Sequence, residues 1–247
     1  MTPTRQRHLL FALLAAGLLL VIIATIIALT RPQRDIQIAA PADPSLPPGG
    51  FTFFDVDRAT VLDRSLRKKL ADTLGSDAIA HATPIDLTIV GPHFLRDHLP
   101  VLDTLNQRLN PAMGGRREHD TTRLTYHRAE RHSMPFRYIE LVFSNRNGRP
   151  LYFIINPTED FADSIATLAS KYGPPRIIQT DNGDAPVRIW EQAGDILVGT
   201  SFTRRNGRLA QELRIYFVDN LKQLVASEDQ ALEQQESSSR KAGERAF

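Results

Sequence analysis

Leucines recur at every fourth position between residues 57 and 74, and this period predicts a helix. Asp57 stands at its start as the N-cap, and Gly75 follows it as a stop. Three further helices are predicted from similar apolar periods: residues 92–109 with a division at Pro100, a helix that Asn156 caps and that ends at Tyr172, and a closing helix over residues 221–232.

Short stretches that are apolar at alternate positions, or apolar throughout, predict the strands of a sheet. Asn147-Gly148 and Asn206-Gly207 predict tight hairpins between neighbouring strands. Because hairpins rather than a regular β-α alternation connect the strands, the predicted fold class is α+β with a largely antiparallel sheet and helices packed on it. The predicted strands are 85–90, 124–128, 136–143, 151–155, 176–179, 187–190, 196–202 and 212–218.

The two hairpins share a motif that indicates an internal repeat. Residues 143–149 (FSNRNGR) match residues 202–208 (FTRRNGR), and an apolar strand and a helix follow each motif. One interpretation is a pair of β-hairpin–helix repeats with their helices on a face of one sheet. The alternative is convergence, because Asn-Gly accepts the positive φ angles that any tight hairpin turn requires.

The N-terminal run 9–30 is apolar over 22 residues, without a charge or a proline. As a helix it measures roughly 33 Å, enough to cross a hydrocarbon core of about 30 Å. The run is too long for the apolar region of a cleaved signal peptide, which is the alternative, so we predict a transmembrane helix. Arg5 and Arg7 before it balance Arg31 and Arg34 after it, and we favour a cytoplasmic N-terminus because the short tail carries no domain to translocate.

Composition divides the rest of the chain. Prolines and glycines predict a stalk before the domain, and a polar, serine-containing stretch predicts a disordered tail after it. The predicted organisation is a cytoplasmic tail at 1–8, a transmembrane helix at 9–30, a stalk at 31–50, an extracytoplasmic α+β domain at 51–226 and a tail at 227–247.

Charge and cysteine content exclude several classes of protein. The net charge of +2 is a mild bias, and without a helix-turn-helix or RNA-binding signature it predicts no nucleic-acid partner. The absence of cysteine excludes disulfides, zinc–thiolate sites and thiol catalysis.

Residues 53–57 read Phe-Phe-Asp-Val-Asp. This motif resembles the first motif of haloacid-dehalogenase-like phosphatases, in which an apolar strand ends in Asp-x-Asp. The resemblance implies a phosphohydrolase with Asp55 as nucleophile and Asp57 as general acid. It covers only these few residues: Thr60 comes one place later than in the family pattern, and no later lysine segment or acidic Gly-Asp motif follows in a matching β-α context.

A basic segment between residues 116 and 137 is the second candidate site. Arginine guanidinium groups bind anions, and near a bilayer they gain affinity for anionic lipid. Three histidines accompany them, but their spacing matches no helical metal-binding pair. A solvated basic loop is the default interpretation of the segment, and an anion or lipid contact is the functional alternative. The candidate contact residues are Arg116, Arg117, Arg123, Arg128 and Arg131.

No catalytic, cofactor-binding or metal-binding constellation follows from the sequence. We therefore expect a non-enzymatic, single-pass protein of the bacterial inner membrane whose C-terminal domain, outside the cytoplasm, binds a protein or an envelope component. The alternatives are a membrane-tethered phosphohydrolase using Asp55 and Asp57, and a cytoplasm-facing adaptor whose basic segment contacts lipid. Trp190 is expected in the core, because lone aromatic side chains usually pack there.

Overall fold

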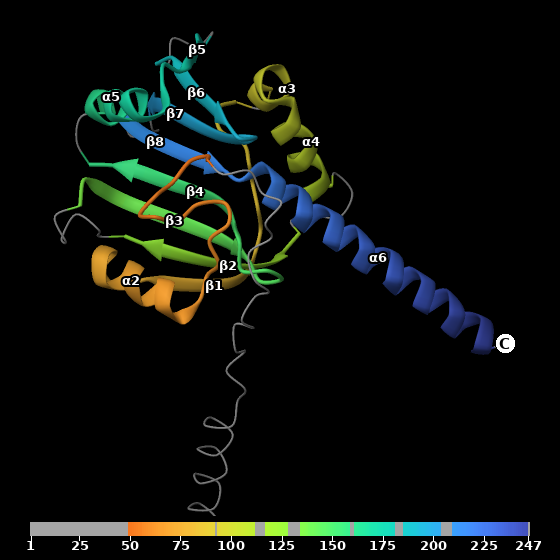
Figure 1. The fold of residues 1–247 in the computed structure, drawn as a ribbon. Helices are drawn as coiled ribbons and strands as arrows, with labels where there is room; N and C mark the ends of the chain where they lie inside the picture. Colours follow the sequence, from red (N-terminus) through yellow and green to blue (C-terminus); the bar gives the residue numbers. More distant parts are fainter. Residues whose placement is uncertain are drawn as a thin grey trace, which may run out of the picture. The chain divides into compact units, whose positions relative to one another are not determined.

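The structure is a computed structural model that describes residues 49–246, apart from 92, 112–116, 128–133, 159–160, 181–184 and 204–208. Eight strands form one sheet in the order β1-β2-β3-β4-β8-β7-β6-β5, and every neighbouring pair is antiparallel (Figure 1). The prediction of an α+β fold with an antiparallel sheet is therefore confirmed.

Seven of the eight predicted strands correspond to strands of the sheet, and β1 was not predicted. The strands are β1 (Ala78–Thr83), β2 (His119–Tyr126), β3 (Phe136–Ser144), β4 (Pro150–Pro157), β5 (Arg176–Ile178), β6 (Val187–Gln192), β7 (Asp195–Thr203) and β8 (Leu209–Tyr216). The helices are α2 (Arg64–Leu74), α3 (Phe94–His98), α4 (Pro100–Leu109), α5 (Phe161–Tyr172) and α6 (Val218–Ala246), and Pro100 divides α3 from α4 as predicted.

Each face of the sheet has its own apolar core, because side chains alternate between the faces along a strand. On one face, here the α4 face, Val142, Tyr152 and Tyr216 pack with α3, α4 and the first turns of α6. On the other, the α2 face, strand side chains pack with α2, α5 and residues 51–62. Trp190 belongs to this second core and is only 3% exposed, which confirms its predicted place.

The two hairpin-forming pairs of strands meet in the middle of the sheet. β4 pairs with β8, so that Phe153 lies opposite Ile215, and a helix follows each of these strands. The helices pack on opposite faces, α5 on the α2 face and α6 on the α4 face, which differs from the expected placement on one face. Gly148 of the first hairpin has φ +68°, as a tight turn requires; the Asn206-Gly207 turn lies outside the described residues.

Two predicted helix starts are wrong. α2 begins at Arg64, where the Asp63 carboxylate accepts a hydrogen bond from the Leu66 amide at 2.7 Å and serves as the N-cap in place of Asp57. α5 begins at Phe161, because β4 continues through Asn156, whose side-chain amide donates to the Gln211 carbonyl of β8 at 3.1 Å. At α2 a later N-cap therefore replaces the predicted one, and at α5 a hydrogen bond to a neighbouring strand holds the predicted cap residue in the sheet.

Residues 85–90, predicted as a strand, cross the α4 face instead of joining the sheet. Side chains satisfy the backbone of this crossing segment (residues 84–90): Arg123 of β2 donates to the Pro84 carbonyl at 2.9 Å, and Tyr216 of β8 donates to the Leu87 carbonyl at 3.1 Å. Because β3 and β4 lie between β2 and β8, the segment passes over both. Ile85 and Leu87 point into the core, which explains the strand-like alternation.

A buried ion pair and a buried amide attach residues 49–62 to β7 and to the start of α6. Arg58 Nη2 lies 2.5 Å from Asp195 Oδ1 at the start of β7, and both side chains are almost fully buried. The Asn220 amide of α6 donates to the Arg58 and Pro150 carbonyls at 2.8 Å each. Burial raises the pKa of Asp195 to about 6, although the Arg58 charge acts in the other direction.

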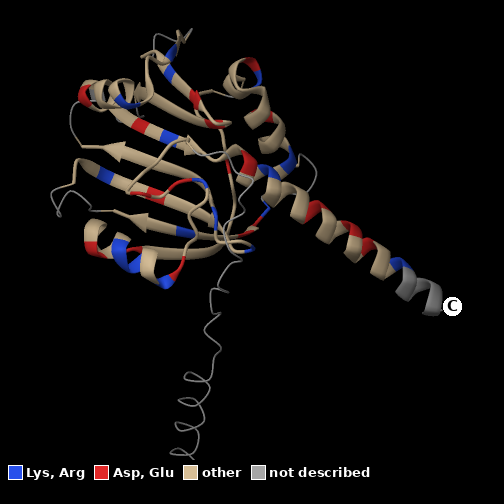
Figure 2. Cartoon of the chain, viewed as in Figure 1, with Lys and Arg blue, Asp and Glu red and all other residues tan. Residues whose placement is uncertain are grey.

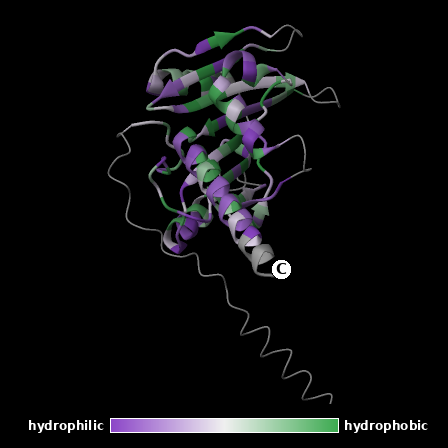
Figure 3. Ribbon diagram, turned by 90° about the vertical axis from the view of Figure 1, so that its right-hand side faces the viewer, coloured by the Kyte–Doolittle hydropathy of each residue, from purple (hydrophilic) through white to green (hydrophobic). Residues whose placement is uncertain are grey.

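The last helix is longer than the sequence predicted. α6 continues through Ala246, beyond residue 232, where the closing helix was predicted to end. Residues 230–240 are exposed and mostly hydrophilic (Figure 3). Among the helices that the structure describes, none has the length and apolarity needed to cross a bilayer. The predicted transmembrane helix at 9–30 lies outside the described residues.

Candidate functional site

The α4 face divides into an apolar half under the helices and a polar half over four strands, β2, β3, β4 and β8. We define the polar half by residues that share this face near the start of β3: Arg123, Tyr138, Glu140, Asn156, Glu212 and Arg214. Figure 2 shows acidic and basic residues close together on β3 and on β8. The polar half arises because polar residues occupy alternate positions of these strands, so that they face the same side of the antiparallel sheet.

Glu140 of β3 is the centre of one hydrogen-bonded group. Tyr138 donates to its Oε2 at 2.6 Å, and Tyr152 donates to its Oε1 at 3.3 Å. Arg123 Nε lies 3.2 Å from Oε1, which is ion-pair distance, but its N–H does not point along that line and makes no hydrogen bond among the described atoms. Burial, together with Glu140, raises the pKa of Tyr138, so this phenol keeps its proton and acts as a donor.

Arg214 of β8 is the centre of a second group. Its Nε donates to Glu212 Oε1 at 2.5 Å, and its Nη1 donates to the Thr88 carbonyl of the crossing segment at 2.6 Å. Burial acts to lower the pKa of Arg214, but Tyr216 and Glu212 outweigh it and the pKa is raised. Arg214 therefore remains charged. Arg214 and Arg123 tie the crossing segment to the sheet at two points, through the Thr88 and Pro84 carbonyls.

A cavity of about 520 Å³ lies at the end of the polar half, a size typical of sites for small ligands. Asn156, Gln211 and Glu212 contribute hydrogen-bonding groups, and His127 and Tyr138 contribute two rings whose centroids are 5.4 Å apart. Arg137 adds an exposed guanidinium, and no carboxylate among the described residues lies within ion-pair distance of it. The complete lining is His127, Arg137, Tyr138, Asn156, Pro157, Thr158, Leu209, Ala210, Gln211 and Glu212.

The structure does not bring the five predicted arginines together as one site. Arg116, Arg128 and Arg131 lie outside the described residues. Arg117 pairs with Glu228 of α6 at 3.4 Å, and Arg123 pairs with Glu140 in the polar half. The two described members of the predicted anion or lipid contact are therefore each compensated by a carboxylate.

The Asp-x-Asp motif occupies a turn and not the end of a sheet strand. Phe54 and Asp55 have φ of 48° and 62°, and Phe53 forms a bridge to Val56. The Asp57 carboxylate accepts hydrogen bonds from the Ala59 and Thr60 amides, and the exposed Asp55 pairs with Lys69 at 2.9 Å. The strand context that the phosphatase resemblance requires is missing from this described segment.

Of the polar half, the sequence predicted only Arg123 as a candidate contact residue, because the apolar positions of each strand carried the prediction of the sheet. A usable signal was present: Tyr138 and Glu140, and likewise Glu212 and Arg214, are polar pairs two residues apart within otherwise apolar strands. Such pairs share a face, and a charged pair on a central strand must find partners. Within the described part of the chain, no group of three or more His, Asp or Glu side chains could hold a metal ion.

The arrangement can bind a ligand by hydrogen bonds, ring contacts and charge. Comparisons of the chain with protein-family models, with curated proteins and with solved structures each found no match.

Proposed function

We propose that the protein is a single-pass membrane-anchored envelope protein whose α+β domain is a non-enzymatic binding module, with its ligand in the cavity of the polar half. The observation that carries the proposal is this cavity, about 520 Å³ in volume and lined by side chains with donors, acceptors and rings. Natural binding sites place a few polar groups in a concave setting of this size.

The anchor and the location rest on the sequence alone. Residues 9–30 are long and apolar enough to span a bilayer, and the Pro- and Gly-rich stalk separates them from the domain. We place the N-terminus in the cytoplasm and the domain in the periplasm of a bacterial inner membrane. A reporter that is active only outside the cytoplasm, fused after Phe247, should be active; activity of a cytoplasm-only reporter at the same position would reverse this orientation.

Two β-hairpin–helix units descended from one ancestor remain part of the proposal in a modified form. The support is the shared FSNRNGR-like motif and the adjacent position of β4 and β8 in the sheet. The opposite packing of α5 and α6 requires the helices to have changed faces after any duplication.

Blocking the cavity tests the binding function directly. Leu209 lines the cavity and is 63% exposed, so Leu209→Trp adds bulk at the mouth at little cost to folding. Val101→Trp is the matched control, since Val101 is also exposed, at 46%, but lies on α4. Full-length protein in detergent should retain an envelope component that Leu209→Trp loses and Val101→Trp keeps; equal retention by both variants would contradict the proposal.

The two alternatives have less support. A phosphohydrolase using Asp55 and Asp57 requires a nucleophile that the described turn does not supply, since Asp55 is exposed and paired with Lys69. It is tested by comparing phosphoester turnover of the native chain with that of Asp55→Asn. A lipid-contacting adaptor would show salt-sensitive binding to anionic vesicles.

A further inference from the structure

The charges around the cavity of the polar half do not cancel. Glu140 is compensated by Arg123 and Glu212 by Arg214, so neither carboxylate is left with an unbalanced charge. Arg137 also lines the cavity, and among described residues no carboxylate lies within ion-pair distance of it. The described lining therefore carries one uncompensated positive charge, which favours a ligand with a negative charge.

Arg137 is chemically suited to that role. Its guanidinium is exposed, so a ligand can reach it, and a planar guanidinium binds a carboxylate or phosphate group through two parallel hydrogen bonds. Two other exposed arginines have acidic partners, since Arg96 pairs with Asp97 and Arg176 pairs with Glu191, whereas the exposed Arg146 donates to the Ser227 carbonyl and does not line the cavity.

The remaining lining groups suit the body of a hydroxylated ring. Asn156 and Glu212 lie on the α4 face and line the cavity with an amide and a carboxylate group, and the Gln211 backbone carbonyl accepts a hydrogen bond from the Asn156 amide. Amide and carboxylate groups bind hydroxyls through hydrogen bonds. Tyr138 and His127 add aromatic surface against which the apolar face of a ring can pack. The volume of about 520 Å³ accommodates one or two such rings.

We infer that the cavity binds an acidic saccharide unit, with its anionic group on Arg137 and its hydroxyls on Asn156 and Glu212. This inference rests on the proposed binding function and specifies the ligand class of the same site. The unit is either a free sugar or one residue of an envelope polymer, since both present the same ring and charge.

Three sugars with the same ring test the charge: glucuronate, glucose and glucosamine are acidic, neutral and basic. Full-length protein in detergent micelles is titrated with each sugar, and binding is followed by ligand-observed NMR, because a ligand of this size binds at roughly millimolar concentration. We expect glucuronate to bind roughly tenfold or more tightly than glucose, and glucosamine to bind most weakly. Equal binding of the three, or a preference for glucosamine, would overturn the inference.

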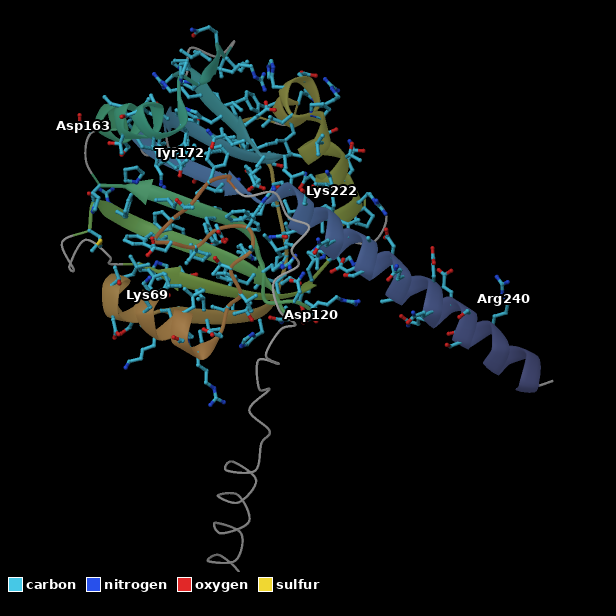
Figure 4. The ribbon with its side chains drawn as sticks, viewed as in Figure 1. Lys69, Asp120, Asp163, Tyr172, Lys222 and Arg240 are labelled. Carbon is cyan, nitrogen blue, oxygen red and sulfur yellow. The ribbon has the colours of Figure 1, made fainter. Side chains whose placement is uncertain are left out.

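Arg137→Ala assigns the charge preference to one residue. The variant should bind glucuronate roughly tenfold to a hundredfold more weakly and leave glucose binding unchanged. Arg240→Ala is the matched control, because Arg240 is an equally exposed arginine that Figure 4 places far along α6, away from the sheet. An Arg137→Ala variant that keeps the preference would also overturn the inference.

Two further titrations, with inorganic phosphate and with an oligomer of glucuronate, identify what part of the ligand is recognised and where it comes from. Inorganic phosphate that displaces glucuronate as well as glucuronate itself does would show that charge alone is recognised, which contradicts a saccharide site. An oligomer of glucuronate that binds more tightly than the monomer points to a polymer as the source. If no sugar binds while Leu209→Trp still abolishes retention of an envelope component, the ligand class is wrong and the binding function stands; if Leu209→Trp has no effect, the function itself fails.

Discussion

The two halves of the α4 face are built from neighbouring residues of the same strands, yet they are stabilised in different ways. In the apolar half, Val142, Tyr152 and the α4 leucines exclude water, and burial supplies the stability. In the polar half, Glu140 and Glu212 are held by arginines that also anchor the crossing segment. Paired buried charges contribute little net stability but fix geometry. The apolar half therefore stabilises the fold, and the polar half supplies the hydrogen-bonding and charged groups of the candidate site.

The largest effect is expected from a cavity in the apolar half. Leu102 of α4 is fully buried, and Leu102→Ala should lower the free energy of unfolding by about 2–5 kcal/mol through lost burial and an unfilled space. Val101→Ala on the same helix is the control, because Val101 is exposed and should cost less than about 0.5 kcal/mol. Urea unfolding of both variants measures the difference; similar values would contradict the assignment of the core.

The buried Arg58–Asp195 ion pair differs from both halves of the α4 face, because both of its charged side chains are almost fully buried. The pKa of Asp195 is raised from 3.8 to about 6, so the folded state binds this proton more tightly than the unfolded state does. Its contribution to stability is present below pH about 4 and is lost as the pH rises through about 6, a change of roughly 3 kcal/mol at most. Unfolding free energies at pH 4, 5, 6 and 7 should decline in this window.

Asp195→Asn isolates that carboxylate. The variant should lose the decline between pH 4 and pH 6, whatever its overall stability, because an amide does not titrate. A native-like decline in the variant would assign the pH dependence to another group.

Breaking one pair in the polar half should have an intermediate effect. Arg214→Met removes the partner of Glu212 and the donor to the Thr88 carbonyl, and we expect a loss of about 1–3 kcal/mol, reduced by partial solvation of the site. Adding Glu212→Gln should restore part of this loss, since no carboxylate is then left without a partner. A double variant less stable than the sum of the single changes would contradict the pairing.

The smallest effect on stability is expected at the rim of the cavity. Arg137 is exposed and has no ion-pair partner among the described residues, so Arg137→Ala should change the free energy of unfolding by less than about 0.5 kcal/mol. Together with a loss of ligand binding, that result would show that the polar half contributes to binding and the apolar half to stability. A large destabilisation would instead give Arg137 a structural role.

Local patterns in the sequence predicted most of the sheet and little of the site. Seven strands, the Asn145–Gly148 turn and the division at Pro100 follow from alternation, Asn-Gly chemistry and proline geometry, all of which are local. The crossing segment was predicted as a strand because Ile85 and Leu87 point inward at alternate positions. This alternation is the same whether the backbone carbonyls of the segment pair with a neighbouring strand or accept hydrogen bonds from the Arg123 and Tyr216 side chains. Only the tertiary structure decides which partner is present.

The helix N-caps and the cavity could not be predicted, because they depend on tertiary contacts that the sequence does not reveal. Asp57 and Asp63 are equally good N-caps by residue type, and the turn at residues 53–60 determines that Asp63 is used. The cavity gathers residues from β3, β4 and β8, together with His127 directly after β2, and β3 and β8 meet there only because both pair with β4. That pairing joins distant parts of the chain, so the predicted basic segment could not include Asn156 or Glu212.

The most direct test of the account is photo-crosslinking from the two halves in living cells. A photoreactive amino acid is placed at Leu209, which lines the cavity, and separately at Val101 on α4, both of them exposed positions. We expect a crosslinked envelope component from position 209 and none from position 101. Crosslinks from position 101 alone, or equal crosslinks from both, would contradict the claim that the polar half is the binding site.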